Sequence, residues 1–171
     1  LWAVVRAMDC DPRRLHVFTD SAYDMLVLSE TRLTEAKQRH NGKLLEDMGF
    51  VAVWGAPRAR KRFNSVAPGG VAVIARKELG AQLVPLDGAC AQHYEAGRLI
   101  HAVIGLGKEN CFHIVGAYGH TNASTDREQR RKNEKLLEDG CSIISGLGAQ
   151  PALFAGDLNV QPGKSTVLQT H

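Results

Sequence analysis

The most constraining feature of this sequence is a short apolar run near its end that stops in two polar residues. Residues 152–155 (ALFA) are apolar and short enough for a strand covered on both faces. Gly156 follows, and it allows the backbone to turn or to approach another segment closely. If the strand continues, the side chains of Asp157 and Asn159 point to the same side. That arrangement suits a metal, a water or a phosphate, and an Asx-type turn is the alternative.

A second polar residue stands at the end of another apolar run. Residues 25–28 (MLVL) predict a buried strand, and Glu30 follows it. Glu30 is either part of a functional site at a strand end, as Asp157 is expected to be, or a solvated acidic residue in a loop. Tyr118 ends a third apolar run, residues 111–118, which pairs as a hairpin with residues 97–105.

The remaining segments alternate between strand and helix patterns. We expect strands at residues 1–7, 50–54, 71–75 and, shorter, 82–85, and helices starting at residues 11–12, 34–35, 125–128 and 165–166. Gly49 is a plausible stop for the second helix, and Thr125 with Glu128 forms a capping box that opens the third. The Gly69-Gly70 pair predicts a turn or bulge that leads into a strand. This order argues for a layered α/β architecture with helices on the outer faces.

Length and composition set the remaining limits. With 171 residues, 44% hydrophobic and 23% charged, the chain is long enough for one domain with a core. The net charge of +3 permits a polyanionic partner without requiring one. No signal-peptide pattern or membrane-spanning run is visible, and we expect an intracellular protein, nuclear if it acts on DNA. The four cysteines lack metal-ligand spacing, so we expect reduced, buried thiols rather than a zinc site; they are Cys10, Cys90, Cys111 and Cys141.

One loop is strongly basic. Arg58, Arg60, Lys61 and Arg62 lie within residues 57–64. The loop is either a solvated surface loop or a contact for the phosphate backbone of a nucleic acid, which needs cations and little sequence specificity. Histidines on the expected strands, at 101 and 113, and in the polar loop, at 120, are interpreted as packed or solvated side chains rather than ligands.

Four segments in this order resemble one family. They are residues 24–33, 69–74, 115–118 and 156–159. Together they are similar to the endonuclease/exonuclease/phosphatase superfamily, the DNase I-like proteins that include exonuclease III-type apurinic endonucleases and the endonuclease domains of non-LTR retrotransposons. The resemblance implies a four-layer α/β sandwich, here one partial domain over residues 1–171, incomplete at its C-terminal end.

The resemblance also implies a role for individual residues. Glu30 matches the family's metal-binding glutamate, with Mg²⁺ or Mn²⁺ as the expected ion. Asp157 matches the aspartate that orients or deprotonates the attacking water, and Asn159 matches the amide that hydrogen-bonds the phosphate or the nucleophile. Tyr118 matches the tyrosine that donates to the phosphoryl oxygens. Arg98 resembles an arginine that supports the acids from behind.

The sequence also departs from the family pattern. No asparagine ends the first expected strand, and the late aspartate–histidine pair of the family has no counterpart here. The leading hypothesis is a metal-dependent phosphodiesterase, a DNA endonuclease in its most specific form, with DNA as partner. We expect this chain to be weakly stable and to show little or no nuclease activity alone. The alternatives are an inactive remnant or binding module, and a same-fold phosphatase acting on a small phosphoester.

Overall fold

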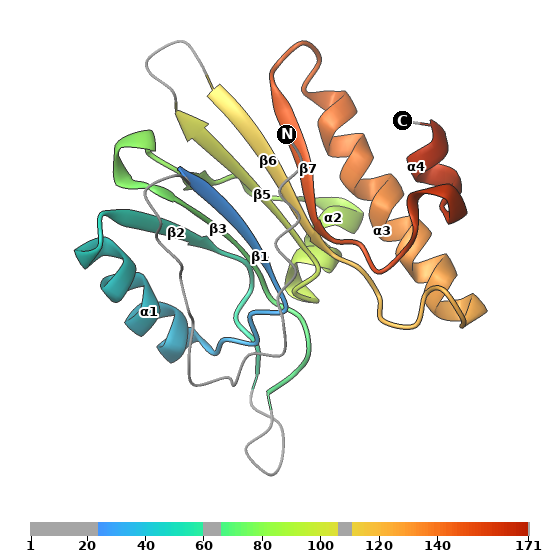
Figure 1. Ribbon diagram of the computed structural model, residues 1–171, viewed down its shortest axis with the longest axis horizontal. Coiled ribbons are helices and arrows are strands. Elements are labelled where there is room, and N and C mark those ends of the chain that lie inside the picture. Colours follow the sequence, from blue (N-terminus) through green and yellow to red (C-terminus); the bar gives the residue numbers. More distant parts are fainter. Residues whose placement is uncertain (1–23, 60–65, 106–110, 171) are drawn as a thin grey trace.

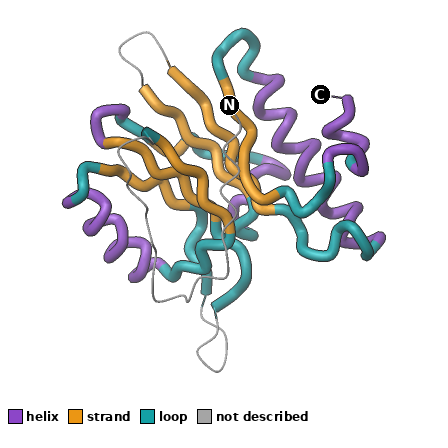
Figure 2. Tube along the Cα trace, in the orientation of Figure 1, coloured by secondary structure: helices purple, strands orange, loops and turns teal. Residues whose placement is uncertain are grey.

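The computed structural model describes residues 24–59, 66–105 and 111–170. Two sheets lie face to face between helices, as Figures 1 and 2 show. The strands are β1 Met25–Ser29, β2 Phe50–Trp54, β3 Val71–Arg76, β4 Gln82–Leu83, β5 Leu99–Gly105, β6 Cys111–Tyr118 and β7 Ala152–Asp157. The helices are α1 Glu35–Asp47, α2 Gly88–Glu95, α3 Arg127–Gly146 and α4 Thr166–Thr170, with 3₁₀ turns at Lys77–Leu79 and Pro162–Lys164.

The first sheet has the order β1-β3-β2, with both neighbours antiparallel to β3. The run of small and β-branched residues in β3 suits this central position, because the strand is buried on both faces. Val71 and Val73 face the second sheet, where they join a core with Ile100 and Ile114. Ile74 points the other way, toward Leu45 of α1. The alternation along β3 therefore connects the core between the sheets with the core under α1.

The second sheet has the order β4-β5-β6-β7. β5 and β6 are antiparallel, whereas β6 and β7 are parallel and are joined by α3. Parallel neighbours need such a crossover connection. Leu136 of α3 packs on Leu99 and Val115, and α2 contributes Cys90 to the same outer core. The order of layers is helix, sheet, sheet, helix, as the sequence predicted.

Most of the predicted elements are confirmed, and two predictions need correction. Helix α2 was not predicted from the sequence; its first turn lacks a side-chain cap, and it buries no residue completely. The cap of α3 is Asp126, which accepts hydrogen bonds from the backbone N–H groups of Glu128 and Gln129 at 2.8 and 3.0 Å. The predicted capping box one residue earlier is therefore wrong. The expected strand at residues 1–7 and the helix that follows it lie outside the described residues.

The predicted environments of the cysteines and histidines are confirmed in part. Cys141 is buried and Cys90 half-buried, but Cys111 is exposed, so not every thiol is buried as predicted; all three are free thiols. His101 is packed as expected, with 5% of its surface exposed. No helix in the part of the chain that the structure describes is long and apolar enough to cross a membrane.

Candidate active site

The ends of β1, β6 and β7 meet at one edge of the two sheets. The parallel register of β6 and β7 places Tyr118 directly beside Asp157. Ser29, the last residue of β1, joins the sheets at this point: its Oγ donates to the Ala117 carbonyl at 3.1 Å and accepts from the Asp157 N–H at 3.2 Å. We call the group formed by Glu30, Tyr118, Asp157 and Asn159 the strand-end site.

The Gly69-Gly70 pair holds the segment that carries Glu30. The Gly70 carbonyl accepts from the Thr31 N–H, and the Gly69 carbonyl from the Arg32 N–H, both at 3.0 Å. Gly70 has φ +101°, and a Cβ there would lie 2.4 Å from the Thr31 Oγ1. Only glycine fits so close to this segment. The pair was predicted as a turn or bulge, and the structure adds that it positions Glu30, which itself has φ +58°.

The Glu30 carboxylate has two neighbours. Arg32 Nε donates to Glu30 Oε1 at 2.9 Å, and Arg32 Nη2 forms an ion pair with the same oxygen. Glu30 also forms a hydrogen bond with Tyr118 that contributes to the raised pKa of the tyrosine. Glu30 is 34% exposed. It therefore lies at the surface of the site, where solvent or a ligand reaches it.

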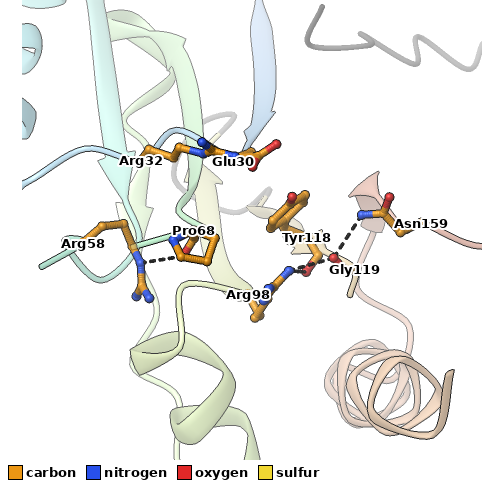
Figure 3. A network of polar contacts seen from close by, with 8 residues as sticks. All are labelled: Glu30, Arg32, Arg58, Pro68, Arg98, Tyr118, Gly119 and Asn159. Atoms are coloured by element: carbon orange, nitrogen blue, oxygen red, sulfur yellow. Dashed lines mark hydrogen bonds and ion pairs between the residues drawn. The ribbon is translucent and has the colours of Figure 1, made fainter. Parts of the chain in front are cut away.

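Tyr118 is held in its protonated form. Its pKa is raised to about 12, first by burial and then by the charge of Glu30 and the hydrogen bond to it, with a smaller contribution from Asp157. The Arg98 guanidinium lies 4.6 Å from the centre of the ring (Figure 3) and opposes this shift. A tyrosine that keeps its proton at neutral pH can donate a hydrogen bond to an anionic oxygen.

Arg98 supports Tyr118 and its loop through the backbone. Its Nη1 donates to the Tyr118 carbonyl at 3.3 Å and to the Gly119 carbonyl at 2.7 Å (Figure 3). Burial lowers its pKa below the usual arginine value, and Glu30 opposes this effect. These contacts place Arg98 beside Tyr118 and the loop that follows it, and its predicted supporting role stays a prediction.

Asp157 and Asn159 form a turn at the end of β7. The strand stops at Asp157, and Asn159 has φ +49°, a region that asparagine tolerates better than most residues. The Asn159 N–H donates to Asp157 Oδ1 at 3.1 Å, as in an Asx-type turn, and Asn159 Nδ2 donates to the Gly119 carbonyl at 3.0 Å. Of the two alternatives that the sequence left open, strand geometry through Asn159 or an Asx-type turn, the structure has the turn. The turn leaves the Asp157 side chain exposed, and the predicted roles of both residues stay predictions.

The sequence analysis missed a buried residue that fixes both loops. Asn133 of α3 has no exposed surface. Its Oδ1 accepts from the His120 N–H at 2.8 Å, and its Nδ2 donates to the Leu158 carbonyl at 3.0 Å. It therefore joins the loop after β6 to the turn after β7. A polar residue among apolar ones on the inner face of the helix was the available signal.

The basic loop lies only partly within the described residues. Arg58 uses its guanidinium to hold backbone: Nε donates to the Pro68 carbonyl at 3.1 Å and Nη1 to the Glu95 carbonyl at 2.9 Å. These bonds tie the loop after β2 to the segment before β3 and to the end of α2; Figure 3 shows the bond to Pro68. The other predicted nucleic-acid-binding residues, Arg60, Lys61 and Arg62, lie outside the described residues.

The chemistry of the strand-end site fits a hard divalent cation. The carboxylates of Glu30 and Asp157 both contribute to the raised pKa of Tyr118, after burial, so both lie close enough to act on the tyrosine. Carboxylate and water oxygens are the ligands that Mg²⁺ prefers. Within residues 24–59, 66–105 and 111–170, no group of three or more His, Cys, Asp or Glu side chains could hold a metal ion. The metal-binding role predicted for Glu30 therefore stays a prediction.

Solved structures with the same arrangement of sheets and helices identify the fold. The chain is similar to TDP2 from D. rerio, humanized by 14 mutations, with a TM-score of 0.54 and 16% identity over 81% of this chain and 50% of that chain. It is also similar to truncated TDP2 from Caenorhabditis elegans, with a TM-score of 0.56 and 16% identity over 88% of this chain and 55% of that chain. Both belong to the endonuclease/exonuclease/phosphatase superfamily. This chain has the DNase I-like fold.

The DNase I-like fold confirms the architecture expected from the four sequence segments. No family model and no curated protein matches the sequence. The chain spans about half the length of the two TDP2 structures. Identity at this level establishes the DNase I-like fold alone, so the activity must be argued from the residues of the strand-end site.

Proposed function

We propose that the strand-end site is a divalent-metal-dependent phosphodiesterase site, with DNA as its substrate. The observation that carries the proposal is the meeting of Glu30, Tyr118 and Asp157 at adjoining strand ends, with Tyr118 held protonated between two carboxylates. Hydrolysis of a phosphodiester needs a base for the attacking water and donors for the phosphoryl oxygens. The site supplies both kinds of group.

Each residue has a distinct part in the proposed reaction. Asp157 accepts the proton of the attacking water; one of its oxygens is oriented by the Asn159 N–H at 3.1 Å. Tyr118 turns its hydroxyl hydrogen bond from Glu30 to a phosphoryl oxygen as negative charge develops there. Glu30 would hold Mg²⁺ or Mn²⁺, which would supply further stabilisation of that charge. Asn159 and Arg98 both bind the Gly119 carbonyl and so keep the loop after Tyr118 in place.

The first test is metal binding. Mn²⁺ titrated into the purified chain and followed by electron paramagnetic resonance should bind at one site, and Glu30→Gln should weaken it about tenfold or more, because it removes the charged ligand. Glu46→Gln, which removes an exposed glutamate at the end of α1, is the matched control and should bind as the parent does. Equal affinities for all three proteins would contradict the proposed metal site.

The second test is hydrolysis. The assay is nicking of supercoiled plasmid with Mg²⁺ at a high protein concentration, because little or no activity is expected of this chain alone. Any nicking that is observed should be lost in Asp157→Asn and kept in Asp47→Asn, which changes an exposed position on α1. Metal binding at Glu30 without any nicking would favour the inactive remnant or binding module. Cleavage of a small phosphoester, with plasmid untouched, would favour the phosphatase alternative.

A further inference from the structure

A separate pocket lies between α2 and α3. Its volume is about 480 Å³, within the usual range for ligand pockets. Every charged side chain that lines it is basic or a histidine: the lining residues are His93, Ala96, Arg98, His120, Arg131, Lys132 and Lys135. None of Glu30, Asp157 and Asn159 lines it. We call it the α2–α3 pocket; it adjoins the strand-end site through Arg98, whose guanidinium also lies over the Tyr118 ring.

The walls of the α2–α3 pocket are fixed by hydrogen bonds. His93 Nε2 and Asp139 Oδ2 are 3.0 Å apart, which ties α2 to α3. The His120 backbone is held by Asn133, and Arg98 by the Gly119 carbonyl. The pocket is therefore formed before any ligand arrives, and little ordering is needed on binding.

The cations of the α2–α3 pocket differ in how they are compensated. Lys132 pairs with Glu128 at 2.7 Å, and Lys135 pairs with Asp139 at 2.8 Å and Glu138 at 3.3 Å. Arg98 and Arg131 form no ion pair within the described residues. Two guanidinium groups that form no ion pair among these residues therefore line the same pocket, and a guanidinium can bind the oxygens of a phosphate through two parallel hydrogen bonds.

His120 reports the electrostatic potential in the pocket. Its pKa is lowered to about 4, first by burial and then by the charges of Arg98, Lys132 and His93. The imidazole is therefore neutral at physiological pH, and neighbouring cations contribute, after burial, to keeping it so. A bound anion would reverse this effect and make protonation of His120 easier.

We propose that the α2–α3 pocket binds a phosphate group through Arg98 and Arg131. The oxygens of an anionic phosphate group would accept hydrogen bonds from both guanidinium groups, and the volume leaves room for the group to which the phosphate is attached. The phosphate comes either from a small molecule or from a nucleic acid strand. In the second case the pocket holds a phosphate other than the one cleaved at the strand-end site, and this part rests on the proposed function.

The test is an NMR titration of the ¹³C-labelled 171-residue chain with inorganic phosphate, with EDTA present so that metal and hydrolysis play no part. Saturating phosphate should raise the pKa of His120 by about one unit, because an opposite charge then lies beside it. Arg131→Gln should weaken phosphate binding about tenfold, because it removes a charge-assisted hydrogen bond. Arg127→Gln, an exposed arginine one turn earlier on α3 that does not line the pocket, is the control and should bind as the parent does.

Two results would overturn the proposal. One is a His120 pKa that phosphate leaves unchanged. The other is an equal loss of affinity in Arg131→Gln and Arg127→Gln, which would show diffuse attraction to a basic surface. A parallel titration with a single-stranded oligodeoxynucleotide separates the two phosphate sources. If Arg131→Gln weakens binding of the oligonucleotide as well as of phosphate, and Arg127→Gln does not, the source is a nucleic acid strand. If Arg131→Gln weakens binding of phosphate but not of the oligonucleotide, the source is a small molecule. Because the titrations measure binding and not catalysis, they test the α2–α3 pocket even if the strand-end site proves to have no phosphodiesterase activity.

Discussion

Gly156→Ala should strongly destabilise the protein and displace Asp157. Gly156 has φ +143°, and an added Cβ would lie 1.9 Å from the Ala117 carbonyl oxygen and 2.8 Å from its carbon. Ordinary contacts between carbon and oxygen are about 3.3 Å or longer. The obstacle is the backbone of β6, which cannot rotate away as a side chain can. β6 and β7 would therefore have to separate where Tyr118 pairs with Asp157.

The expected loss can be estimated from two contributions. A residue with a side chain costs about 1–3 kcal/mol in such a backbone region, and excess volume in a close-packed place costs about 1–3 kcal/mol. The free energy of unfolding should therefore fall by about 2–6 kcal/mol, a large part of the roughly 5–15 kcal/mol typical of a domain. Urea denaturation followed by circular dichroism measures this quantity.

Gly148→Ala is the matched control for this substitution. Gly148 also has positive φ, +63°, but no atom lies within 4 Å of the added Cβ. Gly148→Ala should lower the free energy of unfolding by about 1 kcal/mol, the cost of the left-handed conformation alone. If the two variants differ by less than about 1 kcal/mol, the close approach of β6 and β7 does not limit position 156, and the reasoning is refuted.

Three further predictions concern the groups that hold the site in place. Asn133→Ala should lower the free energy of unfolding by about 2–4 kcal/mol in urea denaturation, because two buried backbone groups lose their partner; an unchanged midpoint would contradict this. Tyr118 should ionise at about pH 12 by ultraviolet absorbance, so stability should fall as the pH rises from 10 to 12, and Glu30→Gln should lower that pKa. Gly70→Ala should weaken Mn²⁺ binding while Gly80→Ala, with open space around its Cβ, should not; equal affinities would show that the glycine pair does not position the metal ligand.

Local sequence patterns were enough to predict most of the elements. The continuous apolar runs at residues 25–28 and 71–75 became β1 and β3, since strands covered on both faces carry no polar alternation. Helix α2 escaped prediction because its sequence has little amphipathic pattern and its register is set by contacts with α3. The cap of α3 was misplaced by one residue because Thr125 and Asp126 both suit the N-cap position, and only the backbone geometry selects between them.

The sequence by itself determined the layered α/β class and which residues stand at strand ends: Glu30, Tyr118 and Asp157. Apolar periodicity and glycine placement are local properties, because they depend only on residues that are neighbours in the sequence. Only the tertiary structure decided that these three residues meet, because the register of β6 with β7 and the bridge through Ser29 depend on contacts between distant segments. The same holds for the α2–α3 pocket, where Arg98 and Arg131 belong to different elements and come together only when the helix packs on the sheet.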